Sequence, residues 1–153
     1  MVHVLLIITA ASFVSSVFST LLVDRFLTER ISIIGSVVGL ERTLNDGIAF
    51  GIDLPEMILF ILIPAALILI AMLAWKSKGN RVMALGFGLL LGGALGNIAD
   101  RFDDGHVTDF IQIGWWPLFN IADSCITIGV IILLLWEMKE KGKRIKGKEQ
   151  EKR

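Results

Sequence analysis

Asp109 and Asp123 are the two residues whose types and positions best suit acid–base chemistry. Asp123 is the third residue of an apolar run, and ionisable side chains are rare in such runs because each costs about 2.5–3.5 kcal/mol at the middle of a membrane-crossing helix. Two carboxylates that share one proton can activate a water molecule and protonate a departing amine, which is the chemistry of peptide hydrolysis. Asp123 could equally have a structural role, because an aspartate near a helix N-terminus caps the helix.

Asn97 and Asn120 are amides near the ends of apolar runs, and each could orient a carboxylate or hydrogen-bond a peptide backbone. Helix capping or a hydrogen bond between helices would account for each of them equally well. No metal-ligand spacing recurs, since His3 and His106 lie in different segments and Cys125 is isolated. We therefore expect no metal and no cysteine or serine nucleophile.

The composition of the chain is that of a membrane protein. Of 153 residues, 54% are hydrophobic and 20% are charged, and the mean hydropathy is +0.72. Soluble domains are typically about 45–50% apolar and about 25% charged. The single cysteine excludes an intrachain disulfide. The 15 basic and 15 acidic residues cancel, so no overall field attracts nucleic acid.

Four apolar runs approach the roughly 20 residues that a membrane span needs, and they cover residues 2–23, 57–75, 82–99 and 121–136. The first run is longer than a signal-peptide core and no basic residue precedes it, so we predict an uncleaved span. Gly88, Gly92 and Gly96 form overlapping G-x-x-x-G patterns, which predict close packing against another helix. The fold class that follows is an all-α membrane protein with four transmembrane helices.

The charges of the connecting segments predict the orientation. Eleven of the 15 lysines and arginines lie in residues 76–81 and 137–153. The segments 24–56 and 100–120 contain more acidic than basic residues. The positive-inside rule therefore places both termini in the cytoplasm and the two acidic segments on the outer side.

The first outer segment has strand-like composition between the first two spans. Residues 31–40 are rich in β-branched side chains and lead to the turn-forming Asn45-Asp46-Gly47. We predict a small extracytoplasmic sheet or hairpin on the outer membrane surface. In the second outer segment, Trp115 and Trp116 fit the aromatic belt of a membrane interface better than a role in stacking on substrate.

We expect one membrane domain over residues 1–137 and a basic cytoplasmic tail over residues 138–153, near anionic lipid head groups. The predicted glycine face can be satisfied within one chain, so we expect a monomer.

Four motifs in order along the chain resemble those of the lipoprotein signal peptidase (signal peptidase II) family. Residues 93–101 contain Gly96-Asn97-Ile98-Ala99-Asp100-Arg101, which is similar to the family's G-N-x-x-D-R motif. Residues 105–111 resemble G-x-V-x-D-F, residues 119–124 resemble F-N-x-A-D-S, and residues 45–51 resemble N-x-G-x-A-F-G. Each motif alone is weak, whereas the ordered set is specific.

The resemblance implies an aspartic endopeptidase of the bacterial inner membrane that cleaves prolipoproteins just before a diacylglyceryl-modified cysteine and works without a metal or organic cofactor. By the same resemblance, Asp109 and Asp123 form the catalytic dyad, at the outer face of the membrane. The residues that would support the dyad or position substrate are Asn45, Asn97, Asp100, Arg101, Asn120 and Asp24.

The chain departs from the family pattern after Asp24. The family usually reads Asp, Gln, any residue, Ser or Thr, then Lys, whereas residues 24–30 read Asp-Arg-Phe-Leu-Thr-Glu-Arg. We expect Arg25 or Arg30 to replace the missing basic charge. A different class of function is a non-enzymatic proton or ion pathway with Asp109 and Asp123 as relay groups. The clustering of these acids at one interface argues against that alternative.

Overall fold

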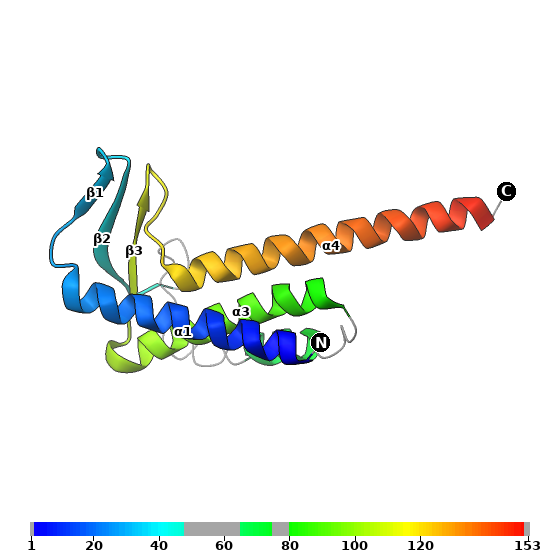
Figure 1. The fold of residues 1–153 in the computed structure, drawn as a ribbon, viewed down its shortest axis with the longest axis horizontal. Coiled ribbons are helices and arrows are strands. Elements are labelled where there is room, and N and C mark those ends of the chain that lie inside the picture. Colours follow the sequence, from blue (N-terminus) through cyan, green and yellow to red (C-terminus); the bar gives the residue numbers. More distant parts are fainter. Residues whose placement is uncertain (1, 48–64, 75–79, 152–153) are drawn as a thin grey trace.

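The protein is mostly helical, with one small antiparallel sheet. A computed structural model describes residues 2–47, 65–74 and 80–151. The long helices are α1 (Val2–Phe26), α3 (Arg81–Asp104) and α4 (Ile121–Glu151), and the strands are β1 (Ile31–Ile34), β2 (Val38–Asn45) and β3 (Val107–Ile113). The sheet stands at one end of the helices, and both chain termini lie at the other end (Figure 1).

Within the described residues, three helices are long and apolar enough to cross a membrane: α1, α3 and α4. The predicted span at 57–75 is described only in part, as the short apolar helix Ala65–Ala74. The rest of that run lies outside the described residues, so the count of four spans stays a prediction. Helix α4 continues well past the predicted end at residue 136 and projects beyond the other helices (Figure 1).

Glycines of α3 let it pack closely against both α1 and α4. A Cβ atom at Gly92 would clash with Ser12 Cβ and would lie 2.5 Å from the Thr9 carbonyl oxygen, so no larger residue fits there. On the other side, a Cβ at Gly93 would lie 2.5 Å from the Ala122 carbonyl oxygen of α4. The predicted close-packing glycine face is therefore confirmed, and α1 is the helix that covers it.

The outward faces of the long helices are exposed and apolar. They carry large side chains that include Leu6, Ile7, Val14, Phe18 and Leu21 of α1 and Leu134 and Leu135 of α4. A bilayer solvates such surfaces, while small residues occupy the contacts between helices. This distribution is what a membrane bundle requires.

The sheet has the order β1-β2-β3, and both pairs of strands are antiparallel. The predicted small sheet or hairpin is confirmed, but the run at 31–40 already contains the hairpin turn, at Gly35 with a φ of 52°, ahead of the turn signal at 45–47. A positive φ is readily available to glycine, which explains why the chain reverses there. The third strand was not predicted, because β3 comes from the second outer segment, between α3 and α4.

A tight helix end places β3 beside the bundle. Gly105 has a φ of 86° and donates its N–H to the Arg101 carbonyl, which ends α3 and redirects the chain into β3. From β3, Phe110 packs with Val23 and Leu27 at the end of α1 in the buried core. One face of β3 is thereby fixed on α1, and its other face is turned towards α3 and α4.

Candidate active site

Asp109 lies in the middle of β3, and only 3% of its surface is exposed. Both of its carboxylate oxygens accept hydrogen bonds from asparagine amides. Asn45 Nδ2 at the end of β2 lies 2.8 Å from Oδ2, and Asn120 Nδ2 lies 3.0 Å from Oδ1. The pairing of Thr43 with Asp109 across β2 and β3 brings Asn45 within reach.

Asp123 lies in the first turn of α4 and caps it reciprocally with Asn120. The Asp123 N–H donates to Asn120 Oδ1 at 2.9 Å, and the Asn120 N–H donates to Asp123 Oδ2 at 3.3 Å. This is the geometry of a capping box. Asp123 Oδ1 also accepts from Asn97 Nδ2 of α3 at 2.8 Å. Asp123 therefore caps the helix and belongs to a polar cluster at the same time, and neither role excludes the other.

The two asparagines connect the two carboxylates. Asn120 Nδ2 donates to Asn97 Oδ1 at 3.1 Å as well as to Asp109, so a continuous chain of hydrogen bonds runs from Asp109 through Asn120 and Asn97 to Asp123. Residues from β2, β3, α3 and α4 meet in this network. Six of the eight predicted site residues are brought together: Asn45, Asn97, Arg101, Asp109, Asn120 and Asp123.

Burial raises the pKa of the Asp109 carboxyl from its ordinary 3.8 to about 6. The hydrogen bond from Asn45 opposes this rise in pKa, the negative charge of Asp123 adds to it, and Arg101 and Asn120 oppose it. Desolvation is the main cause, and the charges around the site partly cancel. A carboxyl with a pKa near 6 can hold a proton far closer to neutrality than an exposed aspartate can.

Arg101, near the end of α3, faces the same cluster. Its Nη2 donates to the Gly47 carbonyl at 2.6 Å, and its Nη1 donates to the Asn97 carbonyl at 3.4 Å. The guanidinium therefore links α3 to the loop that follows β2. Since a guanidinium keeps its charge in proteins, Arg101 can brace the site and stabilise negative charge but is a poor proton carrier.

Asp24 and Asp100 both accept hydrogen bonds from Thr108, which is the neighbour of Asp109 in β3. Asp100 Oδ2 accepts the Thr108 N–H at 2.7 Å, and Asp24 Oδ1 accepts the Thr108 hydroxyl at 3.3 Å. These two acids thus hold the strand that carries Asp109.

The expectation that Arg25 or Arg30 supplies the basic charge near Asp24 is wrong. Arg42 of β2 does so, with its Nε 2.7 Å from Asp24 Oδ1. Arg30 instead contacts Glu41 and Gln112, on the opposite side of the hairpin. The antiparallel return of β2 carries Arg42 back to the end of α1, a long-range contact that sequence spacing could not reveal.

The cluster opens into a cavity of about 800 Å³ between the helices and the sheet. Asp109, Asp123, Asn45, Asn97 and Arg101 form its polar end. Its remaining walls are mostly apolar and come from the Ala65–Ala74 helix, α3, α4 and residues 116–119. In the described part of the chain, no three His, Cys, Asp or Glu side chains gather closely enough to hold a metal ion.

Thr108, Arg42 and the carbonyl of Gly47 are site-supporting groups that reading the sequence missed. Thr108 is only 3% exposed, and it lies next to Asp109 in a segment that was not predicted to be a strand. Had the alternation of Val107, Thr108, Asp109 and Phe110 been interpreted as a strand, Thr108 would have been placed on the face opposite Asp109.

Comparisons with known proteins identify the family. The family model for signal peptidase (SPase) II matches residues 6–139. The lipoprotein signal peptidase of Syntrophomonas wolfei is 44% identical over 74% of this chain and 76% of its own length. That of Halothermothrix orenii is 40% identical over 76% of this chain and 82% of its own length.

A solved structure of a bacterial membrane enzyme, determined by the in meso method at 2.3 Å resolution, superposes with a TM-score of 0.81. It is 28% identical, and the match covers 91% of this chain and 90% of that one. With three apolar helices of its own, the chain is a multi-pass bacterial membrane protein. The matched family model and the relatives agree with the four motifs in the sequence: this chain belongs to the signal peptidase II family.

Proposed function

We propose that this protein is an aspartic endopeptidase that removes the signal peptide from diacylglyceryl-modified prolipoproteins, cleaving before the lipidated cysteine with Asp109 and Asp123 as its dyad. The single observation that carries the assignment is the hydrogen-bonded chain from Asp109 through Asn120 and Asn97 to Asp123 at the end of a large cavity. This network holds two carboxylates with different surroundings at the same end of the cavity, and acid–base catalysis of hydrolysis requires such a pair.

Asp109 is the dyad member that holds the proton, because its burial raises its pKa. Asp123 accepts a proton from water as the water oxygen attacks the scissile carbonyl carbon. The protonated Asp109 donates a hydrogen bond to the carbonyl oxygen as negative charge develops there. When the intermediate collapses, the C–N bond breaks and Asp123 passes the proton it took from water to the departing nitrogen. Both carboxyls return to their starting states, and one water is consumed for each peptide bond cleaved.

The surrounding residues position the dyad. Asn45 and Asn120 fix the two oxygens of Asp109, and Asn97 fixes Asp123. Arg101 braces the loop after β2 and offers positive charge to the developing oxyanion. Asp24 and Asp100 support β3 through Thr108.

The protein is proposed to cross the bacterial cell membrane four times as a monomer, with both termini in the cytoplasm and the dyad at the outer face. Both termini lie at the end of the helices away from the sheet, in keeping with an even number of spans (Figure 1). The apolar walls of the cavity suit the lipid chains and the signal peptide of a substrate that arrives through the membrane. The basic end of α4 would lie near anionic cytoplasmic head groups.

The test is a gel-shift assay with purified protein and a diacylglyceryl-modified prolipoprotein. Wild type should cleave it and should leave the unlipidated precursor intact. Asp109→Asn and Asp123→Asn should each abolish cleavage, while Glu29→Gln, which alters an exposed acid before β1, should cleave normally. Full activity in either aspartate variant would remove that residue from the dyad.

The proton-pathway alternative predicts proton flux in liposomes that does not depend on lipidated substrate. No observation favours it, because the two acids meet at the sheet end of the bundle and do not form a series along the helices.

A further inference from the structure

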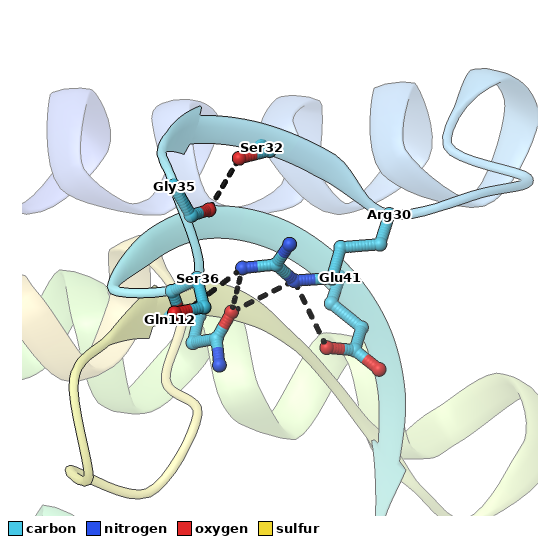
Figure 2. Close-up of polar contacts among 6 residues, drawn as sticks. All are labelled: Arg30, Ser32, Gly35, Ser36, Glu41 and Gln112. Atoms are coloured by element: carbon cyan, nitrogen blue, oxygen red, sulfur yellow. Dashed lines mark hydrogen bonds and ion pairs between the residues drawn. The ribbon is translucent and has the colours of Figure 1, made fainter.

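Arg30 joins three parts of the sheet through one guanidinium group (Figure 2). Its Nη2 and Nε donate to Gln112 Oε1 of β3 at 2.8 and 3.0 Å. Nη2 also donates to the Ser36 carbonyl in the hairpin turn at 3.3 Å, and Nε lies 3.7 Å from Glu41 Oε2 of β2. The residue itself precedes β1, so its side chain reaches across the whole sheet.

Gly39 of β2 provides the space in which this guanidinium lies. A Cβ atom there would be 3.1 Å from Arg30 Nη2 and 2.9 Å from the Ile31 carbonyl oxygen. The arginine thus rests directly on the backbone of β2, between its partners. Two guanidinium nitrogens of Arg30 donate to the same Gln112 oxygen while the group lies over Gly39, and this holds the arginine side chain in one orientation. A lysine ammonium could not make the same pair of contacts.

The contacts of Arg30 continue into the wall of the candidate active site. A second hydrogen bond ties the hairpin turn to the end of β3: the Gly114 N–H donates to the Val37 carbonyl at 2.6 Å. The chain then turns at Gly114, with a φ of 58°, and the Trp116 N–H donates back to the Ile113 carbonyl. Residues 116–119, which follow directly, line the cavity that contains Asp109 and Asp123.

We propose that Arg30 is a positioning residue for substrate binding: by tying the β1–β2 turn to Gln112, it sets the place of the cavity wall formed by residues 116–119. The inference rests on the proposed peptidase function. Arg30 touches neither carboxylate of the dyad, so its loss alters how well substrate is held more than how fast the bond is broken.

The kinetic test compares Arg30→Gln, Arg30→Lys and Gln112→Ala with wild type, using the diacylglyceryl-modified prolipoprotein. Arg25→Gln is the matched control, because Arg25 is an exposed arginine for which the described residues supply no hydrogen bond or ion pair. Losing the charge-assisted contacts of a part-exposed guanidinium in Arg30→Gln should raise KM about threefold to tenfold, with kcat within about twofold. Arg30→Lys should fall between wild type and Arg30→Gln.

The double variant Arg30→Gln/Gln112→Ala should bind no more weakly than Arg30→Gln, because the Arg30 change already breaks the connection to Gln112. Additive increases in KM would mean that the two side chains act independently, and the proposal would be wrong. It would be equally wrong if Arg30→Gln lowered thermal stability but left KM at the value of the Arg25→Gln control.

A second measurement does not depend on cleavage. In a background where Trp75, Trp115 and Trp136 are phenylalanine, Trp116 is the remaining tryptophan of the four in the chain. Arg30→Gln should change acrylamide quenching of Trp116 fluorescence, whereas Arg25→Gln should not. If wild type failed to cleave, the proposed function would fail, and this measurement would still decide whether Arg30 positions the wall. Unchanged quenching would overturn the inference.

Discussion

Replacing Asn45 with alanine should move the pH dependence of cleavage towards higher pH. The Asn45 amide donates to Asp109 Oδ2 at 2.8 Å, and this bond favours the ionised carboxylate. Its removal leaves Asp109 buried with one donor fewer, so the carboxyl keeps its proton to a higher pH. Since cleavage is proposed to need protonated Asp109, the descending limb of kcat/KM should follow that pKa.

The size of the shift follows from the contacts of Asp109. Burial brings its pKa to about 6, and the Asn45 hydrogen bond is the largest effect that opposes the rise. A hydrogen bond to a charged group contributes about 1.5–3 kcal/mol, and one pKa unit corresponds to about 1.36 kcal/mol. Water entering from the open cavity offsets part of the loss, so we expect a shift of about one pH unit.

The assay is kcat/KM for the lipidated substrate in detergent micelles from pH 4.5 to 8.5, with the folded state checked at each pH. Wild type should lose activity as the pH rises through about 6, and Asn45→Ala should lose it about one unit higher. Leu44→Ala, an exposed change in the same strand, is the control and should match wild type. If the descending limb of the kcat/KM profile did not move in Asn45→Ala, or moved to lower pH, the assignment of the shared proton to Asp109 would be refuted.

Other changes test the surroundings of the dyad. Thr108→Val removes the hydroxyl that donates a hydrogen bond to Asp24. Thermal unfolding should show a free energy of unfolding lower by about 1–3 kcal/mol, and the cleavage assay should show a lower kcat. Gly92→Ala forces a methyl group against α1 and should lower the thermal midpoint in detergent by several degrees, whereas Gly142→Ala, in open space, should not. The pKa of Asp109 in the folded protein, about 6, exceeds its ordinary 3.8. Between pH 4 and 7 the free energy of unfolding of wild type should therefore fall by up to about 3 kcal/mol relative to that of Asp109→Asn. The same pH dependence of the free energy of unfolding in both proteins would contradict this.

The helices were the most predictable part of the fold, because a run of apolar residues long enough to cross a bilayer seldom forms anything but a helix. Three of the four predicted spans correspond to α1, α3 and α4, although each helix continues past its predicted end. Hydropathy marks where the hydrocarbon region ends and not where helical hydrogen bonding ends. The basic residues after Trp136 extend α4 because lysine, arginine and glutamate are good helix formers in water.

The sheet was only half predictable. The β-branched run at 31–40 indicated strand, but one glycine inside it, Gly35, was enough to divide it into two strands. β3 was missed because its alternation is brief and lies among aspartates that drew attention for their chemistry. Arg42 and Thr108 lie 18 and 84 residues from Asp24 along the chain. Contacts this far apart leave no local pattern, so neither residue could be assigned to Asp24 from the sequence.

The need for a buried carboxyl explains why the site draws on so many elements. A pKa near 6 requires that Asp109 be buried, and a buried carboxylate destabilises the fold unless donors surround it. No single helix or strand can supply those donors, so Asn45 comes from β2 and Asn120 from the start of α4. The consequence is that the first outer segment must pair with β3 before Asp109 has its full set of partners. Catalytic competence in this protein should therefore depend on the formation of the small sheet as strictly as on the packing of the bundle.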